Sequence, residues 1–272
     1  MNTAGKPELS PSRSVHHSIP TKAIVTGGLG GIGRATAQAM LDAGMRVATL
    51  DLTEGELLHN GEKALSRVCD LRDSEAVRSA IGSAAADLDG IDILVNCAGI
   101  NANDSAETAD EKAWNEVMDI DLKASWLTFQ SALPFLRLSK RASVVNVSSV
   151  HARMTSRQSF PYAAAKAAIE AMTRGIAIDF GLEGVRANCV APGWTTTRLV
   201  ESWLSRQADP TAAAAAVARL HPLGRMVSPA EVAQAILFLA DERSSGITGI
   251  TLTVDGGLSA QLPHIEEPSI RA

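Results

Sequence analysis

The sequence predicts an α/β protein: a single doubly wound domain whose seven-stranded, mostly parallel sheet carries helices on both faces. Three observations lead to this fold class. Apolar runs of strand length alternate with alanine-rich stretches of helical periodicity along the chain. The 272 residues suffice for one large domain, and no internal repeat marks a second. The hydrophobic content of 46% and the charged content of 20% are typical of globular proteins.

The expected elements follow one another in regular alternation. Seven apolar runs are predicted to be strands, at 22–26, 46–50, a run ending near 68–71, 91–95, 143–147, 185–190 and 250–254. Helical spacing predicts helices at 34–43, 54–67, 74–88, 114–137, 162–181 and 228–240. Between the last two strands, 198–220 carries two short helical stretches separated by Asp209-Pro210, and we expect 194–224 to form a lid over the site.

The chain ends are expected to lie outside this fold. Residues 1–20 are polar and proline-containing, which predicts a disordered arm, while 21–260 form the domain and 261–272 a C-terminal tail. The pair His16-His17 in the arm has no further ligand nearby, so we expect a solvated tail there rather than a metal site.

Composition excludes several classes of function. A net charge of −5 without a basic block disfavours nucleic acid or an anionic membrane surface as a partner. No apolar run approaches the ~20 residues of a membrane helix. Three scattered cysteines, Cys69, Cys97 and Cys189, have no metal-ligand spacing and indicate a reducing compartment, so no metal is expected. Because no signal-peptide core begins the chain, we expect a cytoplasmic protein.

A glycine-rich turn follows the first strand. The run Gly27-Gly-Leu-Gly-Gly-Ile-Gly33 leads directly into the first expected helix. Strand, glycine turn and helix together predict a dinucleotide phosphate site, because the bare backbone approaches the phosphates closely and the helix N-terminus offers free N–H groups. Two registers fit: G-x-G-x-x-G at 28, 30 and 33, or T-G-x-x-x-G-x-G starting at Thr26. A merely flexible turn is the alternative.

Asp51 stands at the end of the second expected strand. A carboxylate at that position accepts hydrogen bonds from the adenosine ribose hydroxyls and repels a 2′-phosphate, which favours NAD over NADP. The alternative is that Asp51 serves only as a turn residue.

Tyr162 and Lys166 are four residues apart in an alanine-rich run that is expected to be helical. At that spacing the two side chains share one face, and an ammonium beside a phenol stabilises the phenolate, so the tyrosine pKa is expected to fall. Such a phenol is a proton donor and acceptor usable near neutral pH. An exposed tyrosine and lysine on a surface helix are the alternative.

The order of these and further signals along the chain makes the sequence resemble the short-chain dehydrogenase/reductase family over roughly residues 20–258. The matching signals are T-G-G-L-G-G-I-G at 26–33, Asp51, Asp70, N-C-A-G at 96–99, N-V-S-S at 146–149, Y-A-A-A-K at 162–166, P-G-W-T-T-T at 192–197 and V-D-G-G at 254–257. The resemblance implies a Rossmann-type domain and a tetramer or dimer, while the expectation of NAD as cofactor rests on Asp51.

The resemblance also implies roles for individual residues. Ser149, rather than Ser148, would hold the substrate oxygen, Tyr162 would exchange the proton, and Lys166 would lower the tyrosine pKa and bind the nicotinamide ribose. The implied cofactor contacts are Gly27, Leu29, Gly30, Gly31, Ile32, Gly33, Asp51, Leu52, Asp70, Leu71, Asn96, Ala98, Gly99, Tyr162, Lys166, Pro192, Gly193, Thr195 and Thr197. Asn96 is also expected to tie neighbouring strands together through its amide.

One residue departs from the family pattern. Where the family usually places an asparagine that anchors a water joined to the lysine, this chain has Asp121. We keep Asp121 as a candidate catalytic residue, since a carboxylate still accepts hydrogen bonds and a buried negative charge would hold Lys166 more firmly charged.

The substrate pocket is expected to include Asn101, Ser149, His151, Arg153 and Trp194. The polar members favour a sugar or polyol, while Trp194 and Met154 argue for an apolar substrate. The leading hypothesis is an NAD-dependent oxidoreductase acting on a secondary alcohol or ketone. The alternatives are an NADP-dependent carbonyl reductase and a non-catalytic protein that senses redox state by binding a dinucleotide.

Overall fold

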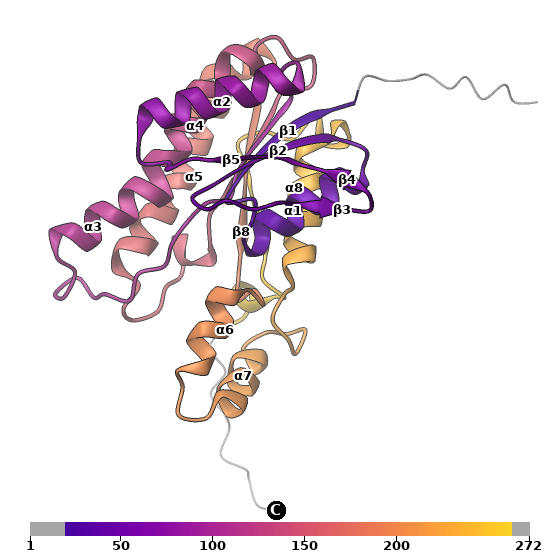
Figure 1. Ribbon diagram of the computed structural model, residues 1–272. Coiled ribbons are helices and arrows are strands. Elements are labelled where there is room, and N and C mark those ends of the chain that lie inside the picture. Colours follow the sequence, from indigo (N-terminus) through magenta and orange to yellow (C-terminus); the bar gives the residue numbers. More distant parts are fainter. Residues whose placement is uncertain (1–19, 263–272) are drawn as a thin grey trace, which may run out of the picture.

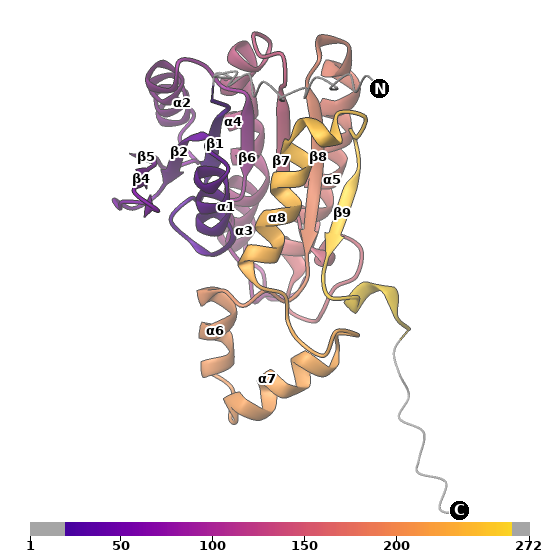
Figure 2. The same ribbon diagram turned by 90° about the vertical axis from the view of Figure 1, so that its right-hand side faces the viewer.

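Seven parallel strands form the central sheet of the computed structural model, which describes residues 20–262 (Figures 1 and 2). The strands are β1 (Lys22–Thr26), β2 (Arg46–Asp51), β5 (Leu65–Val68), β6 (Ile93–Asn96), β7 (Ser143–Val147), β8 (Arg186–Pro192) and β9 (Thr251–Val254). Their order across the sheet is β5-β2-β1-β6-β7-β8-β9. The expected doubly wound α/β fold is confirmed. The expected arm and tail lie almost entirely outside the described residues.

Helices cover both faces of the sheet. On one face, α1 (Gly31–Asp42) packs against α8 (Pro229–Ala240), and on the other α2 (Ser74–Leu88), α4 (Ala124–Leu136) and α5 (Phe160–Phe180) lie side by side (Figure 1). Successive strand residues alternate between two apolar cores, so that Ile24 faces α2 while Val25 faces α1. Both faces of the strands are therefore buried, as their continuous apolar runs predict.

The chain reverses its winding direction at β1. This strand pairs with β2 on one side and β6 on the other, and its last residue, Thr26, is the register partner of both Leu50 and Asn96. In doubly wound sheets, ligands bind at the carboxyl edge where the strand order reverses. The glycine turn starts at this point of the sheet.

The helix expected at 54–67 is absent, and this prediction was wrong. A small antiparallel hairpin of β3 (Leu58–His59) and β4 (Glu62–Lys63) takes its place, followed directly by β5. Asn60 and Gly61 form the two-residue turn with φ of 49° and 85°. Asn-Gly is the favoured pair for such a turn because both positions need positive φ, and this local signal outweighs the weak helical spacing.

The long helix expected at 114–137 is interrupted in its middle. The chain forms α3 (Glu111–Val117), then a π-helical turn (Met118–Lys123), and then α4. A π turn inserts an extra residue into the helical repeat and re-aims the side chains of that turn. Asp121 lies within it and is buried.

The segment expected to form the lid stands beyond the carboxyl ends of the strands (Figure 2). It contains α6 (Arg198–Ser205) and α7 (Pro210–Arg219), and Asp209 caps α7 by accepting from Ala212 N at 2.9 Å. Its two ends are held together, because Thr196 N donates to Val227 O at 2.9 Å and Val227 N donates to Trp194 O at 3.0 Å.

The remaining elements are short. They are the 3-10 turns Val150–Ala152, Gly181–Glu183, Glu242–Ser244 and Leu258–Ala260. Over residues 20–262, every helix is too short or too polar to span a bilayer.

Asn96 joins its own strand, β6, to β7 and α4 below the carboxyl edge. Its amide donates to Asn146 Oδ1 at 2.9 Å and to Ser125 O at 3.2 Å, and it accepts from Thr128 Oγ1 at 2.7 Å. Asn146 in turn donates to Thr173 of α5 at 2.9 Å. All these groups are buried, so the network fixes how β6, β7 and α5 meet beneath the site.

We predict that Asn96→Ala lowers the free energy of unfolding by about 1–3 kcal/mol, because it leaves buried partners without hydrogen bonds. Urea unfolding measures the change. Asn103→Ala, at an exposed loop position, is the matched control and should leave the free energy nearly unchanged. Equal stabilities of the two variants would contradict the structural role of this network.

Candidate active site

The glycine turn leaves room for a ligand only because particular residues lack side chains. Gly27 has φ +63°, and a Cβ there would lie 2.9 Å from Ala98 Cα; a Cβ on Gly33 would overlap the carbonyl oxygen of Gly27. Gly31 has φ +29° and faces Thr197. By contrast, a Cβ on Gly30 would meet nothing closer than 3.9 Å. Gly28 is also constrained, because a Cβ there would lie 2.5 Å from the Thr49 methyl carbon. Position 30 belongs only to the G-x-G-x-x-G register, so the free space around it favours the register that begins at Thr26, with glycine at 27, 31 and 33.

The N-terminus of α1 is open above this turn. Its N-cap, Gly30, supplies no side-chain cap, and the first intrahelical bond runs from Arg34 N to Gly30 O at 2.8 Å. The N–H groups at the start of α1 are free of helical partners and carry the positive end of the helix dipole. Together with the missing Cβ atoms, this arrangement fits a diphosphate.

Asp51 is held at the end of β2 beside the glycine turn. Its Oδ2 accepts from Leu29 N at 3.0 Å and its Oδ1 from Leu52 N at 2.9 Å. The carboxylate is half-buried and fixed by the backbone on both sides. This position suits a partner with hydroxyl donors, such as a ribose.

Thr26 was missed by the sequence reasoning as a site residue. Its hydroxyl accepts from Cys97 N at 3.0 Å and from Ala98 N at 3.1 Å, which holds the chain after β6 against the glycine turn. Only the pairing of β1 with β6 reveals this role. Further along the edge, Leu71 is buried, and the Arg72 side chain hydrogen-bonds the Asp70 carboxylate, which lowers the pKa of Asp70.

The chain after β8 closes the same edge. Pro192 and Thr195 are buried, and a Cβ on Gly193 would lie 2.7 Å from Asp255 Cβ. Thr195 Oγ1 donates to Gly193 O at 3.1 Å. The methyl carbon of Thr197 lies 3.1 Å from where a Cβ on Gly31 would be, so this threonine borders the glycine turn.

Two adjacent serines end β7, and they differ in role. Ser148 Oγ donates to the backbone oxygen of Lys166 at 2.9 Å and is buried, so it anchors α5. Ser149 Oγ accepts from His151 N at 3.2 Å, and the His151 ring packs edge-on against Tyr162 with centroids 5.5 Å apart. His151 therefore connects Ser149 with Tyr162, and the hydroxyl hydrogen of Ser149 remains available for a ligand.

Tyr162 and Lys166 share one face of α5. The Lys166 Nζ lies 5.4 Å from the centroid of the Tyr162 ring and donates to Val147 O at 3.3 Å. The structure thus brings the ends of β7 and α5 together around one ammonium group.

Asp121 reaches the same ammonium from the π turn. Its Oδ2 lies 3.0 Å from Lys166 Nζ, and its Oδ1 accepts from Ile100 N at 2.7 Å. The two side chains are 0% and 5% exposed, respectively. Burial opposes the charge of Lys166, but the attraction of the Asp121 carboxylate, together with Tyr162 and Cys97, outweighs the effect of burial, so the pKa of Lys166 is raised.

The expected substrate residues have different surroundings. Asn101 is exposed. His151 Nδ1 lies 2.9 Å from Thr155 Oγ1, and burial lowers the pKa of its imidazole, so the ring is neutral at pH 7. Arg153 Nε pairs with Glu170 Oε2 at 3.1 Å. Glu170 lies about two turns after Tyr162 on α5. Trp194 packs on Trp203 of α6, with ring centroids 4.9 Å apart.

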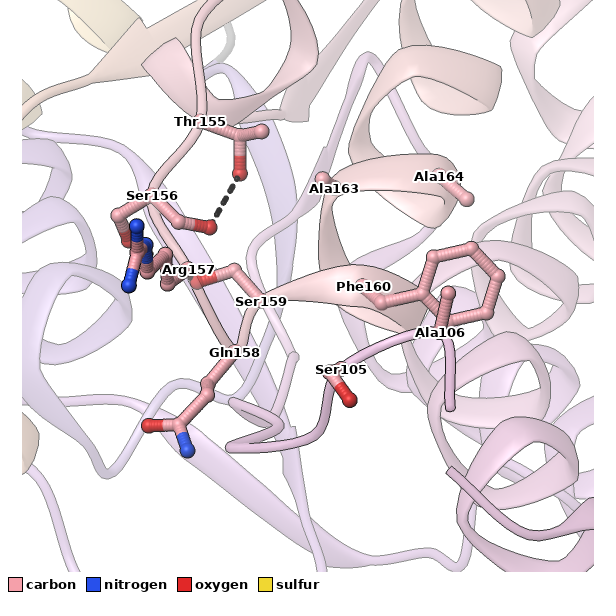
Figure 3. A pocket seen from close by; sticks show the side chains of 10 residues that line it. All are labelled: Ser105, Ala106, Thr155, Ser156, Arg157, Gln158, Ser159, Phe160, Ala163 and Ala164. Atoms are coloured by element: carbon pink, nitrogen blue, oxygen red, sulfur yellow. Dashed lines mark hydrogen bonds between the residues drawn. The ribbon is translucent and has the colours of Figure 1, made fainter. Parts of the chain in front are cut away.

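A hollow of about 710 Å³ lies at the N-terminal end of α5 (Figure 3). Its lining comes from the loop before α5, from the first turns of α5 and from the loop after β6 (Figure 3). None of Ser149, Tyr162 and Lys166 lines it, so this hollow is separate from the contacts among those three residues.

Comparisons with known proteins find relatives that match most of the chain. A family model described as Enoyl-(Acyl carrier protein) reductase matches residues 27–259. Cis-4-hydroxycyclohexanecarboxylate dehydrogenase from Sinomonas cyclohexanicum is 36% identical over 245 residues, covering 88% of this chain and 96% of that protein. L-fucose dehydrogenase from Bos taurus is 35% identical, covering 86% and 87%. The ligand-free aldohexose dehydrogenase of Thermoplasma acidophilum superposes with a TM-score of 0.86 at 31% identity, covering 92% and 98%.

We predict that Gly33→Ala weakens NADH binding roughly tenfold or more, because the new methyl group forces the glycine turn to open. Fluorescence titration with NADH measures the affinity, and thermal unfolding checks that the variant folds. Gly82→Ala, in α2 with open space around the added Cβ, is the control and should bind NADH as the wild type does. Unchanged binding by Gly33→Ala would contradict the assignment of the phosphate site.

Proposed function

The chain belongs to the short-chain dehydrogenase/reductase family, and on that premise we propose that it is an NAD-dependent oxidoreductase. It interconverts a secondary alcohol and a ketone on a sugar or polyol. The observation that carries the proposal is the convergence of Ser149, Tyr162 and Lys166 beside a glycine turn shaped for a diphosphate. The relatives named above support dehydrogenase chemistry on alcohols.

The proton and the developing charge are handled by three side chains. Tyr162 Oη exchanges a proton with the substrate oxygen, and the Ser149 hydroxyl donates a hydrogen bond to that oxygen as its charge grows. Lys166 stays protonated beside Asp121 and favours the phenolate. When bound, the nicotinamide dinucleotide supplies or accepts the hydride. The glycine turn, Asp51, the N–H groups of α1 and Thr197 would hold the dinucleotide.

The preference for NAD rests on Asp51. Its carboxylate is pinned by Leu29 N and Leu52 N, so it does not swing aside to admit a 2′-phosphate. A 2′-phosphate bound next to Asp51 would bring a second negative charge close to the carboxylate, and the two charges would repel each other in this half-buried site. The alternative, an NADP-dependent carbonyl reductase, requires a cation in place of this carboxylate.

The names of the relatives support the proposed substrate class. Their names specify L-fucose, an aldohexose and a hydroxycyclohexanecarboxylate, and each carries hydroxyl groups. Neutral His151 and exposed Asn101 offer hydrogen bonds to such groups. One observation favours a second candidate, a less polar carbocyclic alcohol: the packed rings of Trp194 and Trp203 give one side of the site an apolar surface. A screen of sugars, polyols and cyclic alcohols, read as NADH absorbance, decides between them.

The proposal includes a homo-oligomer, a tetramer or dimer, and a cytoplasmic location. Long helices such as α5 offer surfaces that can pair across a two-fold axis. The three cysteines are all free thiols, which fits a reducing compartment.

We predict that Tyr162→Phe lowers turnover by at least roughly 10²-fold, because the substrate oxygen loses its proton donor. NADH binding, measured by fluorescence titration, should stay the same. Full activity in this variant would refute the role of the phenol. A wild-type protein that binds NADH but turns over no alcohol or ketone would favour the redox sensor instead.

We predict that the wild type binds NADH at least about tenfold tighter than NADPH and that Asp51→Asn narrows this ratio, because the repulsion of the 2′-phosphate is lost. Paired fluorescence titrations measure both affinities. Asp89→Asn makes the same charge change at the opposite, amino edge of the sheet, next to Lys22, and should keep the ratio. Tighter binding of NADPH by the wild type would overturn the NAD assignment.

A further inference from the structure

We propose that Asp121 is a positioning residue that sets the pH dependence of the reaction by offsetting the charge that Lys166 presents to Tyr162. The proposal rests on the proposed function, since it concerns the same tyrosine.

The contact between Asp121 and Lys166 is part of the fold. The π turn between α3 and α4 turns the carboxylate inward, and Ile100 N fixes its Oδ1 at 2.7 Å. Its Oδ2 then lies 3.0 Å from Lys166 Nζ with both side chains buried. A Cβ on Gly99 would come within 3.2 Å of both of these atoms. The carboxylate is thus confined beside the ammonium.

Two opposite charges in contact act on a third group mainly through their difference. Lys166 Nζ, 5.4 Å from the centroid of the Tyr162 ring, favours the phenolate, while the Asp121 carboxylate, 3.0 Å from that ammonium, disfavours the phenolate. Because the pair is shielded from water, neither charge is screened by solvent or salt as a surface charge would be. The ammonium therefore favours the phenolate less than it would beside a neutral amide.

The other titratable groups that face this cluster do not substitute for Asp121. After β6, burial raises the pKa of the Cys97 thiol to about 12, and on β8 burial does the same for Cys189. In the turn after β7, burial lowers the pKa of His151. These three groups are neutral near pH 7. On α5, the buried Glu170 carboxylate is paired with Arg153, so its charge is offset by its own partner.

The ionisation of Tyr162 can be measured directly in this protein. Tyr162 is the sole tyrosine among 272 residues, so the ultraviolet absorbance of phenolate reports its ionisation alone, without substrate or cofactor. In Asp121→Asn, we expect the midpoint of phenolate formation to fall by on the order of one pH unit relative to the wild type. The acidic limb of the kcat/KM profile should move to lower pH in parallel.

Asp119→Asn is the matched control. Asp119 lies on the same π turn, is partly exposed, and pairs with Lys123 at 3.1 Å. The same charge change there should leave the midpoint of phenolate formation and the acidic limb of the kcat/KM profile unchanged. Asp121→Glu keeps the negative charge and should stay closer to the wild type than Asp121→Asn does. Circular dichroism at each pH confirms that the titrated protein is folded.

A phenolate midpoint that stays or rises in Asp121→Asn would overturn the proposal. If that variant does not fold, Asp121→Ser removes the same charge and carries the same expectation. The absorbance titration separates this inference from the proposed function. An enzyme inactive on every alcohol tested could still show the shift, while an active enzyme without the shift refutes only the role of Asp121.

Discussion

A lysine ammonium almost wholly removed from water is the feature on which this active site depends. Burying such a charge costs several kcal/mol unless a partner of opposite charge is close. Lys166 has that partner in Asp121, 3.0 Å away, and a further acceptor in Val147 O. The pair joins α5 to the π turn between α3 and α4, and the Val147 contact joins it to the end of β7. The fold and the charge beside Tyr162 therefore stabilise each other, because each buried charge is offset by the other.

The second constraint is close approach of backbone to backbone at the reversal of strand order. Gly27 and Gly33 pack so tightly that a side chain on either would collide with its neighbour. The hydroxyl of Thr26 holds the chain after β6 in the same place. As a result, the glycine turn that suits a diphosphate and the chain after β6 are held together at the carboxyl edge of the sheet. The segment of α6 and α7, which was expected to form a lid, stands beyond that edge (Figure 2).

Much of this could be predicted from the sequence, because its local signals are strong. The strands are continuous apolar runs, α2 was expected at 74–88 and lies there, and the helix expected at 228–240 is α8, which Ser228 caps. The hairpin at 58–63 was missed because its helical spacing was weighed above the Asn-Gly pair. The π turn and the Arg153–Glu170 pair depend on contacts between distant segments, which no local pattern contains. The same holds for the hydroxyl of Thr26, whose role exists only once β1 and β6 are neighbours.

The central claim is that one carboxyl edge holds a dinucleotide at the glycine turn while Lys166 remains paired with Asp121. A crystal structure of the protein with NAD⁺ tests it most directly. The account predicts the diphosphate over the N-terminus of α1, the adenosine ribose at Asp51, and the nicotinamide ribose within hydrogen-bonding reach of Lys166 Nζ. A dinucleotide bound at another surface, or a Lys166 side chain turned away from Tyr162, would contradict it.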